Sequence, residues 1–115
     1  MKKDLLVFIK HILVSIKDIE SFSKGLSKDK FVKDNLRQNA IIRKIEIIGE
    51  AVKNLSDSFK NKYSEVLWKE IAGTRDKIIH HYFGVDLDII WKIIKTDLPK
   101  LEKKIIKILK KERQG

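Results

Sequence analysis

The amino-acid sequence predicts an all-α protein, an antiparallel bundle of four to five helices joined by short loops. Apolar residues recur at steps of three and four along most of the chain, which gives each helix one apolar face. No segment alternates between apolar and polar residues as a strand does, and no repeat or low-complexity linker interrupts the 115 residues. We therefore expect a single helical domain over residues 1–115.

The first helix is predicted to run from Lys3 to about Lys24. Its apolar stripe consists of Leu5, Ile9, Ile12, Ile16 and Ile19. Gly25 follows, and glycine ends many helices because it adopts the left-handed conformation without strain. Ser27 is then the expected N-cap of a second helical span, since its hydroxyl can accept a hydrogen bond from the first turn.

The second helical span is predicted to reach about residue 55, with a bend at residues 33–35. Its apolar stripe consists of Phe31, Leu36, Ile41, Ile45, Ile48, Val52 and Leu55. Ile42 and Ile47 lie off this stripe, so the span is apolar on two sides, which favours a dimer. Gly49 costs about 1 kcal/mol relative to alanine inside a helix, and close packing of another helix is the expected reason for it.

Two short helices are predicted after this span. Ser56 begins the first of them, and Ser64 is the expected N-cap of the second, which contains Trp68. We expect Trp68 to lie in the core, because large aromatic residues at helical spacing usually do.

The last helix is predicted to begin at Asp86, as its N-cap, and to continue to the C-terminal region. Its apolar stripe consists of Leu87, Ile90, Trp91, Ile94, Leu98, Leu101, Ile105 and Ile108. Pro99 lies inside this pattern, so we expect the helix to kink there or to start again after Asp97.

The chain is strongly basic, with a formal net charge of +10 and 22 lysines against four arginines. Half of this charge, +5, lies between Lys100 and Arg113, where seven residues are basic and two are acidic. Such a stretch suits a polyanion partner, and a solvated lysine-rich helix face explains it equally well.

Several classes of protein and site are disfavoured by composition. The chain has no cysteine, which excludes a thiol nucleophile and a thiolate metal site. It has no apolar run long enough for a membrane span, and its first residues do not resemble a signal peptide. We therefore expect a cytoplasmic protein that does not contact a membrane.

The residues that carry chemistry gather between Gly73 and Gly84. Arg75 supplies a permanently charged, planar fork that suits phosphate oxygens, and His80 supplies an imidazole that titrates near neutral pH. Tyr82 adds a phenol that can donate a hydrogen bond, stack on a base or accept a covalent group. On one regular helix, Arg75 and His80 would point roughly 140° apart. Either the helix ends near His80, or the two side chains meet across a symmetric interface.

The pattern R-x-x-x-x-H-x-Y at Arg75, His80 and Tyr82 resembles the motif of HEPN-domain ribonucleases of the HepT-like toxin family. The likeness covers nearly the whole chain. The other matching segments are Ile47–Ala51, Trp68 with Ile71–Gly73, Tyr82–Asp86, Trp91 and Leu98–Leu101. This resemblance implies a dimeric HEPN-like domain over residues 1–115 that acts as an endoribonuclease toxin of a toxin–antitoxin system.

The resemblance also implies roles for individual residues. Arg75 and His80 would be the catalytic pair of a composite site near the dimer interface, which cleaves RNA without a metal or another cofactor. Asp76 would be the polar residue after the motif arginine, and Glu50 would line the cleft. From the residues alone, Glu50 is a solvated carboxylate or a partner of Arg43, Lys53 or Asn54. His81 does not match the motif but could substitute for His80 or bind phosphate in the same cleft. The implied partner is a minimal nucleotidyltransferase antitoxin, which uses ATP to attach AMP to the motif tyrosine, here Tyr82, and so blocks the toxin.

Two other functions stay open on the residues alone. The chain can be a non-catalytic dimeric helical partner, an adaptor, of a nucleotidyltransferase, because a fold does not settle a function. It can also be a basic helical protein that binds RNA or DNA, for which the C-terminal lysines are the only support. Cleavage of RNA by the purified chain separates the enzyme from both alternatives.

Overall fold

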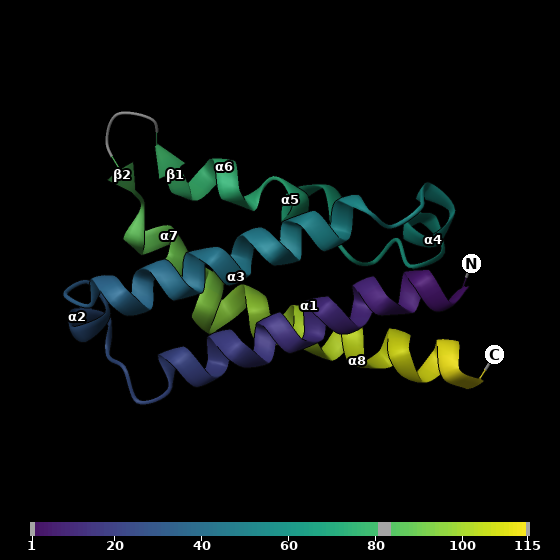
Figure 1. The fold of residues 1–115 in the computed structure, drawn as a ribbon, viewed down its shortest axis with the longest axis horizontal. Coiled ribbons are helices and arrows are strands. Elements are labelled where there is room, and N and C mark those ends of the chain that lie inside the picture. The colour runs from purple at the N-terminus through teal and green to yellow at the C-terminus, as the bar shows by residue number, and fades with distance from the viewer. Residues whose placement is uncertain (1, 81–83, 115) are drawn as a thin grey trace.

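The computed structural model describes residues 2–80 and 84–114 and confirms the all-α fold class (Figure 1). Two long helices, α1 (Lys2–Ser23) and α3 (Asn35–Lys53), lie side by side and antiparallel. A third long helical stretch packs on α1 and ends beside its start. This stretch consists of α7 (Leu87–Lys92), the π-helical segment η1 (Ile93–Asp97) and α8 (Leu98–Gln114).

The other elements are short. They are α2 (Lys28–Phe31), α4 (Asp57–Lys62), α5 (Trp68–Ala72), α6 (Thr74–Ile78), β1 (Ile79–His80) and β2 (Gly84–Val85). The expected bend at residues 33–35 is thus a complete break, and α3 begins after it with Asp34 as N-cap. The two strands form a small antiparallel pair that the sequence pattern did not predict. No helix among the described residues combines the length and the apolar composition that a bilayer span requires.

Among the side chains that the structure describes, the predicted apolar stripes form one buried cluster with Leu87 and Trp91 packed at its edge, and Leu36 is the exception. The side chain of Leu5 lies outside the described ones. The described core residues that are fully buried are Ile9, Ile12, Ile16, Ile19, Phe31, Ile41, Val52, Ile78, Ile90, Ile105 and Ile108. Leu36, which was expected in the stripe of the second span, is 81% exposed. That prediction is wrong because the break before α3 changes the rotation of the helix, so Leu36 and Phe31 no longer share one continuous face.

Most of the predicted helix starts are confirmed by their hydrogen bonds. The hydroxyls of Ser27 and Ser56 and the carboxylate of Asp86 each accept from the backbone N–H three residues later. The prediction for Ser64 is wrong, because α5 begins only at Trp68 and has no side-chain cap. The buried Trp68 donates its indole N–H to the carbonyls of residues 60 and 63, which holds the intervening chain in turns.

The α-helix starts again directly after Asp97, which is one of the two expectations for Pro99. The helical backbone is continuous from α7 through η1 to α8, and the residues before the proline form the wider π-helical turns. Proline has no N–H to donate, and its ring collides with the carbonyl four residues earlier in a regular α-helix. The π-helical segment relieves this collision because its hydrogen bonds span five residues instead of four.

Gly49 lies where α3 approaches the end of α5. A Cβ atom at this position would lie 3.4 Å from the carbonyl oxygen of Ala72, so a methyl group fits and a larger side chain does not. We expect Gly49→Ala to leave the free energy of unfolding unchanged or raise it, and Gly49→Leu to lower it by about 1–3 kcal/mol. Chemical denaturation measures both values. Equal stability of the two variants would contradict this close packing.

Tyr63 and Glu112 join the end of α4 to the end of α8. The phenol donates a hydrogen bond to the nearly buried carboxylate of Glu112, which also accepts from Lys62 Nζ at 2.8 Å. Burial, reinforced by the bond to Glu112, raises the pKa of Tyr63 to about 12. An unfolded tyrosine has a pKa of about 10. The phenol therefore stabilises the fold below pH 10, and this contribution is lost between about pH 10 and 12.

The variant Tyr63→Phe tests this contact. We expect it to lower the free energy of unfolding at pH 8 by about 1–3 kcal/mol, because Glu112 loses one of its donors. The difference in stability between wild type and variant should shrink as the pH rises from 10 to 12. Denaturation curves at several pH values give this difference, and a gap that stays constant over that range would contradict the assignment.

Candidate functional site

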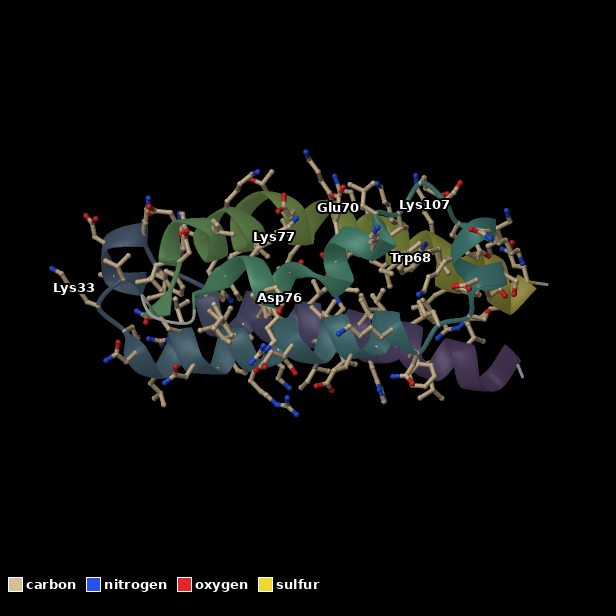
Figure 2. All side chains as sticks on the ribbon, turned by 90° about the horizontal axis from the view of Figure 1, so that it is seen from above. Lys33, Trp68, Glu70, Asp76, Lys77 and Lys107 are labelled. Carbon is tan, nitrogen blue, oxygen red and sulfur yellow. The ribbon has the colours of Figure 1, made fainter. Side chains whose placement is uncertain are left out.

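Helix α6 carries the arginine of the motif and lies between α3 and α7. Gly73 joins it to α5, and the fully buried side chain of Ile78 fixes its other end in the core. Figure 2 shows Asp76 on the side of α6 that faces α3 and Lys77 on the side that faces α7. The two sides of this short helix therefore face different parts of the surface.

Arg75 is held by α3 and remains accessible. Its Nε donates a hydrogen bond to Oε2 of Glu46 at 2.7 Å, and its Nη1 lies 4.0 Å from Oδ1 of Asp76. The Arg75 side chain is 54% exposed. A guanidinium has five N–H donors, and within the described residues only Nε makes a hydrogen bond. The other donors can bind an anion such as a phosphate.

The helix ends between Arg75 and His80. Helix α6 stops at Ile78, Ile79 has extended backbone angles, and His80 pairs with Gly84 in the β1–β2 ladder. Gly84 has a φ of +80°, which explains why a glycine begins β2. The first of the two expected alternatives is therefore correct, and the 140° separation of a regular helix does not apply.

Three predicted side chains lie outside the described residues. They are the imidazole of His80 and the whole of His81 and Tyr82. Their roles therefore stay predictions. The backbone on both sides of them is placed by the strand pair and by the hydrogen bond from Asp86 N–H to the carbonyl of Ile78, at 2.7 Å.

The other candidate cleft residues are both exposed carboxylates. Asp76 follows Arg75 on α6 and is the more exposed of the two. Glu50 lies on α3, where its Oε1 is 3.9 Å from Nη1 of Arg43. The carboxylate of α3 that contacts Arg75 is instead Glu46, one helical turn earlier, which no motif indicated. Glu46 could have been found only by predicting which turn of α3 faces α6.

A groove of about 540 Å³ opens on the other side of α6 from Asp76, between α3 and the α7–α8 stretch. Its described lining is mainly aliphatic, also includes four lysines, Thr74, Glu70 and Asp97, and contains no aromatic residue and no arginine. It therefore lacks the stacking surfaces that hold single-stranded bases. Among the side chains that the structure describes, no three carboxylates or imidazoles gather in a way that could hold a metal ion.

The described residues thus form an α-helical bundle. Its exposed Arg75, five residues before His80 in the sequence, is a candidate phosphate-binding group. Residues 12–108 match the family described as "Ribonuclease HepT-like". The chain therefore belongs to the ribonuclease HepT-like family, and this membership places it among RNA-cleaving enzymes. No solved structure matches the chain significantly.

Curated relatives agree with this family. A Caldanaerobacter subterraneus protein named "Putative RNase TTE0752" is 50% identical over 92% of this chain and 95% of its own length. The "Probable ribonuclease HepT" of Thermococcus cleftensis is 42% identical over 96% of this chain and its full length. A Methanocaldococcus jannaschii protein named "Gamma-glutamylcyclotransferase and putative RNase MJ0434" is 48% identical over 95% of this chain. The chain spans about half the length of this last relative, 49%.

Proposed function

We propose that this chain is a metal-independent endoribonuclease that acts as the toxin of a toxin–antitoxin pair. The observation that carries the proposal is the placement of Arg75, which exposes its guanidinium on the helix that ends two residues before His80. An arginine fork binds the two free oxygens of an RNA phosphate, and a histidine exchanges protons at cellular pH. Membership of the ribonuclease HepT-like family supports the choice of RNA as substrate.

The simplest reaction for these groups uses the RNA's own 2′-hydroxyl as nucleophile. The bond from O2′ to phosphorus forms while the bond from phosphorus to O5′ breaks, which leaves a 2′,3′-cyclic phosphate and a 5′-hydroxyl. A base takes the proton of the 2′-hydroxyl, and an acid gives a proton to O5′. His80 exchanges protons in this scheme, and Arg75 stabilises the negative charge that grows on the phosphorus oxygens.

A dimer would complete the site. One imidazole cannot act as base and acid at the same moment, so two copies of the motif facing a common groove supply both groups. The partly buried Ile42 and Ile47 of α3 leave apolar surface for such contact. We therefore propose a homodimer with a composite site at or beside its two-fold axis. Light scattering that finds only monomers at micromolar concentration would contradict it.

Tyr82 is proposed as the point of control. A minimal nucleotidyltransferase antitoxin would transfer AMP from ATP to its phenol, with release of pyrophosphate. The new phosphodiester would place negative charge two residues from His80 and near Arg75, where it would compete with RNA phosphate. Asp76, Glu50 and His81 remain candidates for the lining of the same cleft.

Expression of the chain in a bacterial host tests the proposed toxin activity. We expect growth arrest and degraded RNA with the chain alone, and normal growth when the nucleotidyltransferase is co-expressed. An adaptor or a simple nucleic-acid-binding protein would leave the RNA intact. The purified chain should also cleave RNA in the presence of a chelator, since the reaction needs no metal. Intact RNA in both assays would exclude the endoribonuclease.

A further inference from the structure

A carboxylate outside every motif contacts the arginine of the proposed site. Glu46 lies 29 residues before Arg75 and accepts the hydrogen bond of its Nε at 2.7 Å. The side chain of Glu46 is 25% exposed against 54% for Arg75, so the contact point lies deeper than the arginine itself. We propose that Glu46 is a positioning residue, which fixes the guanidinium in the orientation that receives an RNA phosphate. This inference rests on the proposed function.

Glu46 contacts Nε of Arg75, which indicates that it orients the guanidinium and does not block phosphate from binding to it. A guanidinium binds phosphate best through two parallel N–H bonds from one edge of its fork. With Nε held by Glu46, both Nη groups keep their hydrogen-bond donors, because within the described residues neither of them makes a hydrogen bond. A carboxylate that competed with phosphate would instead occupy the Nη pair.

Glu46 is itself held in a fixed place. The neighbouring residues Ile45 and Ile48 are buried, so this part of α3 belongs to the core. At Gly49, α3 comes close to the backbone of Ala72, just before α6 begins. The separation of Glu46 from Arg75 is therefore set by packed backbone, and the ion pair transfers this rigidity to a long, otherwise mobile side chain.

Steady-state cleavage of RNA by purified full-length variants tests the proposal. We expect Glu46→Ala to lower kcat by about tenfold or more while KM changes less than about threefold, since misorientation of a group acts mainly on the transition state. Glu46→Gln keeps an oxygen that accepts from Nε, so its kcat should stay within about threefold of wild type. The matched control is Asp88→Ala, which removes a 2.8 Å ion pair between α7 and Lys28 of α2, so that neither partner lies on α3 or α6. Circular dichroism checks that all three variants fold.

Two results would overturn the positioning role. One is an active wild type whose kcat is equal to that of Glu46→Ala. The other is a kcat of Glu46→Gln that is as low as that of Glu46→Ala. A wild type that cleaves no RNA would refute the proposed function instead.

The Arg75 Nε–H signal in a nitrogen-15 NMR spectrum tests positioning without any cleavage assay. We expect a distinct, slowly exchanging signal in wild type and Glu46→Gln and its loss in Glu46→Ala. An unchanged signal in Glu46→Ala would overturn the inference.

Discussion

Arg75→Ala is expected to lower the rate of RNA cleavage by at least about 10²–10³-fold, because the transition state loses its main cationic partner. The fold should survive, since the only hydrogen bond lost among the described residues belongs to a largely exposed ion pair, and such pairs contribute about 0–1 kcal/mol. Arg37→Ala is the matched control. It removes another exposed arginine that is ion-paired at 2.7 Å, to Asp34 at the start of α3.

His80→Ala should cause a loss of the same order, because proton transfer by a positioned side chain contributes about 10²–10⁴-fold. His81→Ala should be milder, since His81 does not occupy a motif position. Initial rates on a defined RNA, with thermal unfolding as the check on folding, compare these variants. Full cleavage by a folded His80→Ala protein would defeat the assignment of the proton-transfer group.

Tyr82→Phe is expected to keep substantial nuclease activity and to escape neutralisation by the nucleotidyltransferase. A phenol with an ordinary pKa of about 10 is a poor general base at neutral pH, so its loss should not stop the reaction. The same hydroxyl is the proposed acceptor of AMP, and phenylalanine has none. Co-expression of Tyr82→Phe with the nucleotidyltransferase should therefore arrest growth where wild type does not.

Intact-mass spectrometry after co-expression gives the direct readout of this modification. Wild type should gain the mass of one or more AMP groups, and Tyr82→Phe should gain none. An AMP-sized increase that persists in the variant would assign the modification to another residue. Complete loss of cleavage in a well-folded Tyr82→Phe protein would mean that the phenol takes part in the chemistry.

The sequence predicted those parts of the fold that depend on neighbouring residues. Helix starts at Ser27, Ser56 and Asp86 depend on a hydrogen bond to an N–H three residues away, and the pattern is visible in the chain. Apolar stripes depend on the helical period alone. Where packing competes with such local preferences, the prediction failed. Ser64 does not cap a helix, because the chain after it forms turns, held by the indole of the buried Trp68, and α5 begins only at Trp68.

The candidate site was predictable only in part for the same reason. The motif indicated Arg75, and its spacing left open whether the helix ends before His80, which it does. The partner of Arg75 could not be predicted, because it depends on which turn of α3 faces α6. Glu46 and Glu50 are chemically identical and one turn apart, and the close approach of helices at Gly49 decides between them. No short sequence pattern shows which of these two glutamates contacts Arg75.

Analysis of the RNA ends after cleavage tests the central claim most directly. Purified wild type and His80→Ala would be incubated with a defined RNA in the presence of a chelator, and the products would be identified by mass spectrometry. We expect wild type to produce 2′,3′-cyclic phosphate and 5′-hydroxyl ends, and His80→Ala to produce almost none, since 2′-hydroxyl attack needs the proton transfer that His80 supplies. Products with 3′-hydroxyl and 5′-phosphate ends, or equal rates for the two proteins, would contradict the proposed mechanism.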